Sequence, residues 1–202
     1  MSSFLRIAAI LLFGLLQGCT DSPSLDYVSE NGVILAFGDS LTVGVGAPKK
    51  DSYPSVLARL SGRRVINAGV SGEVTSEGLT RLPIMLEEYQ PRLVILLQGG
   101  NDILRGKEIG LTKANLSAMI TMVQNRGADV VLVGVPEKKL FSDVAPIYKE
   151  LAIEYNIILL DNTLSMLLKK NKYKSDPIHL NALGYKKLAE IIHSRLVEGG
   201  AL

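Results

Sequence analysis

Short apolar runs alternate with segments of helical periodicity along most of the chain. The runs are nearly continuous and bounded by Gly, Asp or Asn, which is typical of buried parallel strands. They cover residues 33–37, 64–68, 93–97, 130–133 and 157–160. Apolar positions spaced three and four apart predict helices over 53–60, 79–89, 111–126, 144–155 and 165–170. A last helix is expected to begin at Asn181, which suits an N-cap. The alternation predicts an α/β sandwich around a parallel sheet.

The first 32 residues do not follow this pattern. A short basic segment precedes an apolar run over residues 7–16, which is too short for a membrane span of roughly 20 residues. The run ends in Leu16-Gln17-Gly18-Cys19, which resembles a bacterial lipoprotein signal. We therefore expect a signal peptide over 1–18, a lipid on Cys19 and a polar tether over 19–32. The alternatives are an ordinary signal peptide or an uncleaved anchor, with Cys19 incidental.

Either form of this leader predicts export. A lipid on Cys19 would make the protein a membrane-anchored lipoprotein, which we expect to face the periplasm. Residues 33–202 then form the folded domain.

Composition narrows the classes of function. The chain has 202 residues, a formal net charge of +2 and a single cysteine. This length suits one domain with an ample core. The small net charge argues against a nucleic-acid partner, and lysine runs such as 169–172 are expected to be solvated. One cysteine excludes an internal disulfide and disfavours a metal site built by the protein.

Two short motifs near opposite ends of the chain carry candidate chemistry. Gly38-Asp39-Ser40-Leu41 directly follows the first apolar run, and Asp176-Pro177-Ile178-His179 precedes the last helix. A serine becomes a good nucleophile only when a base takes its proton and a third group orients that base. The chain has only two histidines. We predict Ser40 as nucleophile, His179 as base and Asp176 as the residue that orients His179.

Two further motifs supply hydrogen-bond donors. Residues 67–73 follow the second apolar run, and Gly99-Gly100-Asn101-Asp102 follows the third. Acyl transfer needs donors aimed at the developing oxyanion, and glycine lets a backbone amide approach closely. The amides of Ser40 and Gly72 with the Asn101 side chain would form a three-donor oxyanion hole. Asp39 is expected to brace this site, and Asp102 is expected to support its own loop.

These four motifs, in this order, resemble the SGNH (GDSL) hydrolase superfamily over about residues 33–197. Residues 70–73, 78–83 and 99–106 are most similar to its bacterial thioesterase I, lysophospholipase and arylesterase branch. The resemblance implies a flavodoxin-like three-layer sandwich with five parallel strands in the order 2-1-3-4-5. It also implies hydrolysis of ester or thioester bonds without a cofactor.

The predicted function is therefore that of a serine esterase acting on small acyl esters or lysophospholipids. Arg105 is a candidate contact for an anionic substrate group, the alternative being a solvated side chain. A carbohydrate or peptidoglycan O-acetylesterase is the alternative enzyme. A lipoprotein that only binds a ligand is the alternative outside enzymes. Acyl-chain length and the choice between ester and thioester stay open.

Overall fold

The computed structural model describes residues 23–137 and 143–202, so the predicted signal peptide and Cys19 lie outside the described residues. Its centre is a parallel sheet of five strands in the order β2-β1-β3-β4-β5, which confirms the predicted topology. The strands are β1 (Val33–Gly38), β2 (Arg64–Gly69), β3 (Leu93–Leu97), β4 (Asp129–Val133) and β5 (Ile158–Leu160).

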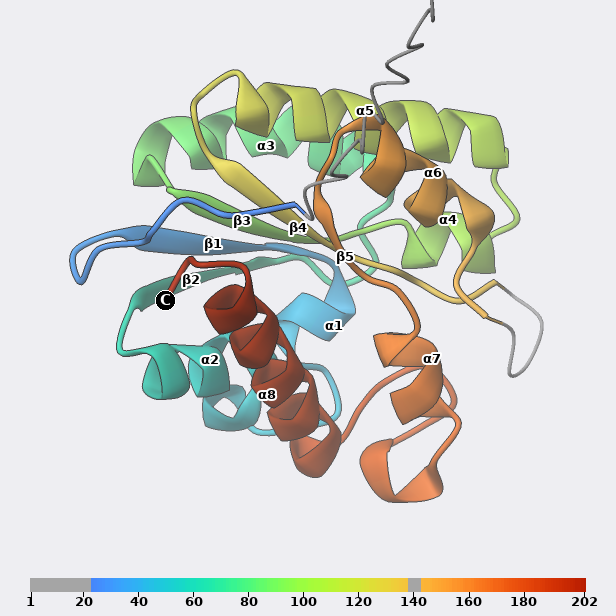
Figure 1. The fold of residues 1–202 in the computed structure, drawn as a ribbon. Helices are drawn as coiled ribbons and strands as arrows, with labels where there is room; N and C mark the ends of the chain where they lie inside the picture. The colour runs from blue at the N-terminus through green and yellow to red at the C-terminus, as the bar shows by residue number, and fades with distance from the viewer. Residues whose placement is uncertain (1–22, 138–142) are drawn as a thin grey trace, which may run out of the picture.

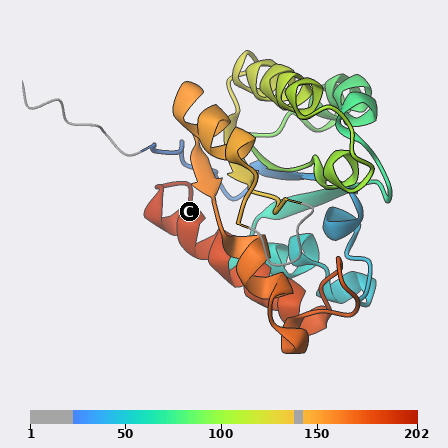
Figure 2. The same ribbon diagram turned by 90° about the vertical axis from the view of Figure 1, so that its right-hand side faces the viewer.

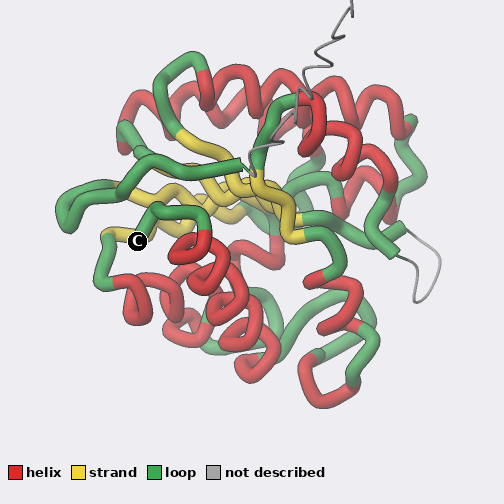
Figure 3. Tube along the Cα trace, in the orientation of Figure 1, coloured by secondary structure: helices red, strands yellow, loops and turns green. Residues whose placement is uncertain are grey.

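Helices cover both faces of the sheet, which gives three layers (Figures 1 and 3). One face carries α3 (Thr75–Tyr89), α5 (Ile109–Gln124) and α6 (Pro146–Glu154), and the other carries α2 (Tyr53–Ser61) and α8 (Ala182–Glu198). A shorter helix, α7 (Thr163–Leu168), follows β5, and two 3₁₀ turns span η1 (Lys49–Asp51) and η2 (Asn171–Tyr173). Within the described ranges, no helix is both long and apolar enough to cross a membrane.

The sequence accounts for this arrangement. Every residue of β1 and β3 is buried, because these strands lie inside the sheet with helices over both faces. The side chain of Asn181 accepts a hydrogen bond of 3.0 Å from the Gly184 amide, which confirms it as the N-cap of α8.

Two short helices were not predicted. They are α1 (Ser40–Val43) and α4 (Gly100–Leu104), and each directly follows the carboxyl end of a strand. Four or five residues are too few for a helical period to show in the sequence. Their positions at one edge of the sheet bring two of the candidate motifs together.

The predicted tether over 19–32 needs a correction, because most of its described part packs onto the domain. The Leu25 amide donates to the Gly199 carbonyl at 2.8 Å, and the Val28 amide donates to that of Ala201 at 2.9 Å. Val28 is fully buried, and the Arg63 side chain donates to its carbonyl oxygen. The polar composition of the segment concealed two apolar side chains that help to close the core.

Candidate active site

Ser40 lies beyond the carboxyl end of the buried strand β1 and is separated from it by one residue, Asp39. The carboxylate of that aspartate, Asp39, accepts a hydrogen bond of 3.0 Å from the Leu41 amide and so caps α1. The cap turns the chain out of the sheet into a helix. As a result, Ser40 is the first residue of α1 and lines a cavity at this edge.

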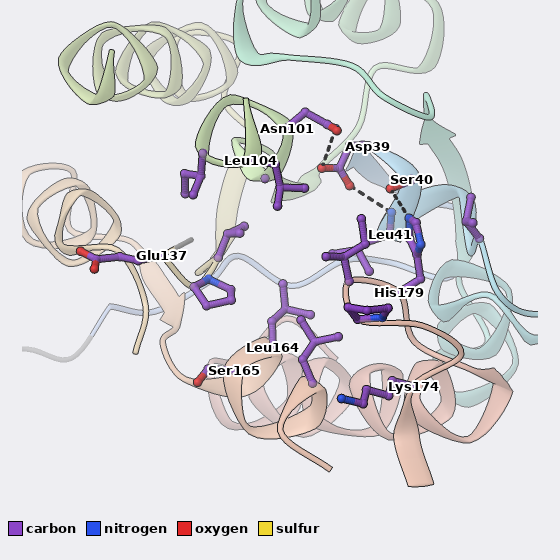
Figure 4. A pocket seen from close by; sticks show the side chains of 18 of the residues that line it. Asp39, Ser40, Leu41, Asn101, Leu104, Glu137, Leu164, Ser165, Lys174 and His179 are labelled. Atoms are coloured by element: carbon purple, nitrogen blue, oxygen red, sulfur yellow. Dashed lines mark hydrogen bonds between the residues drawn. The ribbon is translucent and has the colours of Figure 1, made fainter. Parts of the chain in front are cut away.

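The structure brings the three predicted residues of the triad into one chain of hydrogen bonds, of which Figure 4 shows the contact between Ser40 and His179. The His179 Nε2 lies 3.0 Å from the Ser40 hydroxyl oxygen, and its Nδ1 lies 2.7 Å from Asp176 Oδ2. The second oxygen of Asp176 accepts hydrogen bonds from the amides of Ile178, at 2.9 Å, and His179, at 2.8 Å. The aspartate therefore fixes both the backbone and the ring of His179.

Hydrogen bonds keep Asp176 ionised. Its partial burial acts to raise the pKa, but the Ile178 amide and the His179 ring and amide together hold the pKa of Asp176 below its usual value. A carboxylate that stays charged is suited to orient an imidazole and to stabilise the imidazolium that forms when the ring takes a proton.

The surroundings of Asp39 shift its pKa in the opposite direction. It is buried, and this desolvation raises the pKa of Asp39 from 3.8 to about 6 against the lowering effect of the Leu41 amide. Its second oxygen lies 3.3 Å from the Asn101 side-chain nitrogen. The expected supporting role of Asp39 is therefore visible as two contacts, one to α1 and one to α4.

The three predicted oxyanion donors also line the cavity. No described residue accepts a hydrogen bond from the backbone amide of Ser40 or Gly72. Gly72 has a φ of +79°, a conformation that favours glycine. The Asn101 Nδ2 donates to the Glu73 carbonyl at 3.0 Å, which holds the amide between two loops.

Arg105 lies beside the Gly72 peptide. Its guanidinium donates a hydrogen bond of 2.8 Å to the Gly72 carbonyl oxygen. This contact fixes the orientation of the peptide that contains a predicted oxyanion donor. It was not among the two roles considered for Arg105 from the sequence.

A buried polar cluster beneath Asn101 was missed by the sequence analysis. Both Glu73 carboxylate oxygens lie 2.7 Å from the Arg81 guanidinium, and the Gln98 amide donates to one of them at 2.5 Å. The Arg81 guanidinium also stacks 4.1 Å from the centre of the Phe37 ring. A Cβ on Gly78 would lie 2.8 Å from the Gln98 nitrogen, so this approach requires glycine.

The cluster explains why four separate stretches of sequence belong to one site. The Glu73 carbonyl receives Asn101, while its carboxylate is held by Arg81 of α3 and by Gln98 at the end of β3. Asp102 braces the same region by accepting hydrogen bonds from the Thr75 amide, at 2.9 Å, and hydroxyl, at 2.7 Å. The predicted supporting role of Asp102 is confirmed.

The cavity beside Ser40 has a volume of about 590 Å³, within the usual range for small-molecule sites. Most of its wall is apolar, and Leu104 and Leu164 project into it from different helices (Figure 4). Its apolar lining consists of Leu41, Val45, Ile103, Leu104, Val135, Pro136, Leu164, Leu168, Pro177 and Ile178. Among the described residues there is no cluster of His, Cys, Asp and Glu suited to a metal ion.

A parallel sheet in this strand order, with these residues at its carboxyl edge, has the fold of the SGNH hydrolases. The chain belongs to the GDSL-like Lipase/Acylhydrolase family, whose model matches residues 36–187.

Comparison with individual proteins agrees with this assignment. The chain is 33% identical to an arylesterase of Vibrio mimicus over 96% of this chain and 98% of the relative. It is 31% identical to the thioesterase 1/protease 1/lysophospholipase L1 of Escherichia coli K12 over 73% and 75% of the two chains. The SGNH-hydrolase family esterase AlinE4 superposes with a TM-score of 0.66 at 33% identity, covering 85% of this chain and 97% of that one. The protein is a carboxylic ester hydrolase.

Proposed function

We propose that the protein hydrolyses acyl esters through a serine triad. His179 takes the proton of Ser40 as the serine oxygen attacks the acyl carbonyl carbon, and Asp176 stabilises the imidazolium. The proton then passes from His179 to the leaving alcohol or thiol. A water molecule, deprotonated by the same imidazole, attacks the acyl-enzyme and releases the acid. The observation that carries this proposal is the unbroken hydrogen-bond series from Ser40 through His179 to Asp176.

The negative charge of the tetrahedral intermediate needs donors that are in place before the reaction. We assign this role to the amides of Ser40 and Gly72 and to the Asn101 side chain. The two backbone amides are unpaired in the described part of the chain, and Asn101 is held in position by Glu73. The oxyanion would accept hydrogen bonds from these two amides and from Asn101, whose contact with Asp39 is long at 3.3 Å.

The cavity favours an acyl chain of several carbons over an acetyl group. Its volume and apolar wall suit a hydrocarbon chain, which gains free energy by leaving water. The names of the relatives, arylesterase and lysophospholipase, point to aryl esters and lysophospholipids as substrate classes.

Variants of the triad residues and a comparison of two substrates test the proposal. Ser40→Ala should abolish hydrolysis while leaving the circular dichroism spectrum unchanged, and a fluorophosphonate should label wild type but not the variant. His179→Ala should be inactive and His193→Ala, the matched histidine control, should be active. Wild type should hydrolyse p-nitrophenyl octanoate with a higher kcat/KM than the acetate. Near-normal turnover by Ser40→Ala would refute the nucleophile, and acetate-only activity would refute the acyl-chain assignment.

We further propose that the protein is exported and anchored through a lipid on Cys19. The support is the apolar run and the Leu16-Gln17-Gly18-Cys19 motif in the sequence. Metabolic labelling with palmitate should mark the full-length protein, and Cys19→Ser should remove the label. An unlabelled, soluble mature protein in the periplasm would support export and overturn the anchor.

A further inference from the structure

Basic side chains gather at one side of the cavity opening. Four lysines occur within the six residues 169–174, and two of them, Lys169 and Lys174, line the cavity itself. The acidic residue nearest to them along the chain is Asp176, so the segment from 169 to 176 keeps four positive charges against one negative charge. On the opposite side of the cavity, α4 is followed by Arg105, Lys107 and Glu108, which leave a net positive charge. The whole chain has a net charge of only +2, so this is a local concentration.

Large apolar side chains are exposed in the same two segments. Leu104 and Ile178 line the cavity and are 40% and 42% exposed, and Leu111 at the start of α5 is 61% exposed. We call residues 103–111 and 166–178 the rim. Both parts of the rim lie on the side of the molecule that faces the viewer in Figure 2.

Acidic residues on a third side of the opening do not cancel this charge. Glu137 lines the cavity, and the Asp143 carboxylate lies 3.7 Å from the Lys169 ammonium. Lys170 and Lys172 are exposed beyond this pair, and Lys172 stacks on the Tyr173 ring at 4.8 Å. The rim thus combines apolar side chains with lysines, as surfaces that bind the lipid interface do.

We propose that the rim docks the enzyme on a lipid surface with anionic headgroups and that the cavity opens directly onto that surface. The lysines would contact the headgroups, while Leu104, Leu111 and Ile178 enter the boundary with the acyl chains. The proposal concerns binding; only its consequence for lipid substrates rests on the proposed function.

The combination of side chains identifies this partner. Lysines alone would suit any polyanion, and exposed leucines alone would suit an apolar protein surface. Together they match an interface where phosphate groups lie directly above hydrocarbon. The apolar cavity wall continues from Leu104 and Ile178 toward Ser40, which would allow a lipid chain to enter without crossing water.

Vesicle co-sedimentation of the full chain tests this docking. Every protein would carry Ser40→Ala and Cys19→Ser, so that neither hydrolysis nor a lipid on Cys19 contributes and the N-terminal residues are identical. The test variant is Lys170→Glu/Lys172→Glu, two residues that do not line the cavity. The matched charge control is Arg64→Glu/Arg126→Glu, at the opposite end of the sheet. The vesicles are phosphatidylglycerol with phosphatidylcholine, or phosphatidylcholine alone.

The expected result is preferential binding of the parent protein to the anionic vesicles, weakened by salt. Each basic residue near an anionic surface contributes roughly a fivefold gain in binding. Lys170→Glu/Lys172→Glu should therefore lose at least about twentyfold, and the control double variant less than twofold. Equal binding to both vesicle types, or equal losses in both double variants, would overturn the proposal.

A second pair separates a lipid surface from a soluble polyanion. Leu111→Ser should weaken vesicle binding several-fold, whereas Ile84→Ser, on a side chain 62% exposed on α3, should not. A silent Leu111→Ser would indicate a purely ionic partner and overturn docking on lipid.

Activity of otherwise unmodified enzyme completes the test. Lys170→Glu/Lys172→Glu should leave hydrolysis of soluble p-nitrophenyl butyrate unchanged and slow hydrolysis of lysophosphatidylcholine held in anionic vesicles. If wild type binds these vesicles but hydrolyses no lysophospholipid, the substrate proposal fails while the docking proposal stands.

Discussion

Two aspartates serve the same site under opposite conditions. Asp39 is 2% exposed and its carboxylate touches the Leu41 amide and Asn101, whereas the Asp176 side chain is 42% exposed and touches His179. Burial raises the pKa of Asp39 to about 6, while hydrogen bonds lower that of Asp176. Closeness to Ser40 in the sequence would have favoured Asp39 as the partner of the base, whereas closeness to His179 favours Asp176.

The difference shows that access to solvent decides the role of a carboxylate here. In the proposed mechanism Asp176 orients the base and must remain charged, and its hydrogen-bond donors favour the charged form by lowering the pKa of Asp176. Asp39 lies where charge is costly, so its contribution is to hold two helices in place.

The largest expected effect is a difference in kcat between variants of the two aspartates. Asp176→Asn should lower kcat by about 10⁴, because the amide favours the wrong tautomer of His179. Asp39→Asn should lower kcat less than about tenfold, because an asparagine still caps α1. Steady-state kinetics on one p-nitrophenyl ester measures both. A larger loss in Asp39→Asn would reverse the roles assigned here.

The next effect concerns the buried cluster that supports Asn101. Arg81→Met should lower the free energy of unfolding by about 3–5 kcal/mol, because Glu73 is left buried without its cation. The control is Arg195→Met, which removes an exposed pair with Glu198 of 2.8 Å and should cost at most about 1 kcal/mol. Urea unfolding measures both variants. Equal losses would mean that burial of the Glu73 pair has no special weight.

Asn101 links the buried aspartate to the reaction. Asn101→Ala should lower kcat by about 10²–10³, equivalent to roughly 2.7–4 kcal/mol, with little change in KM. Asn101→Asp should be at least as poor, because it places a carboxylate beside Asp39 and the oxyanion. A defect confined to KM would move Asn101 from transition-state stabilisation to substrate binding.

The smallest effect is a dependence of stability on pH. Folded Asp39 keeps its proton up to about pH 6, whereas in the unfolded chain its pKa is 3.8. The folded state therefore binds the proton more tightly, and the Asp39 contribution falls by up to about 3 kcal/mol as pH rises from about 4 to about 6. Asp176 acts in the opposite sense: its contribution is present above its unfolded pKa and is lost as pH falls through its folded pKa.

Unfolding of wild type and Asp39→Asn at several pH values tests this directly. Between pH 4 and pH 6 the free energy of unfolding of wild type should fall relative to that of Asp39→Asn. Above pH 6 the difference between the two should stay constant. A constant difference across this range would show that Asp39 is ionised in the folded state at pH 4.

The apolar runs predicted the five strands, and the resemblance to the SGNH hydrolases implied their order. The motifs around Ser40 and His179 predicted that these two residues meet, as the structure places them. The five apolar runs and the motifs around Ser40 and His179 each stand out within a few residues. The cluster of Glu73, Arg81 and Gln98 could not be predicted in this way, because a charged residue on a helix is usually solvated. Its burial depends on the packing of α3 against the loop after β2.

The prediction of a tether over residues 19–32 needed correction for a related reason. Leu25 and Val28 are apolar side chains in a polar stretch, and two positions are too few to show a hydrophobic periodicity. Their partners, Gly199 and Ala201, lie at the other end of the chain. Contacts between distant segments leave no local pattern, so only the folded structure reveals them.

The hydrogen bond between Ser40 and His179 spans 139 residues of sequence. In the proposed mechanism the nucleophile is synthesised early, and its base follows 139 residues later. A partly made chain therefore cannot attack an acyl ester by this route, however well its first strands have formed. Hydrolysis by this mechanism thus reports that the segment around His179 has been made and has reached Ser40, which makes a chromogenic ester a direct assay of this contact.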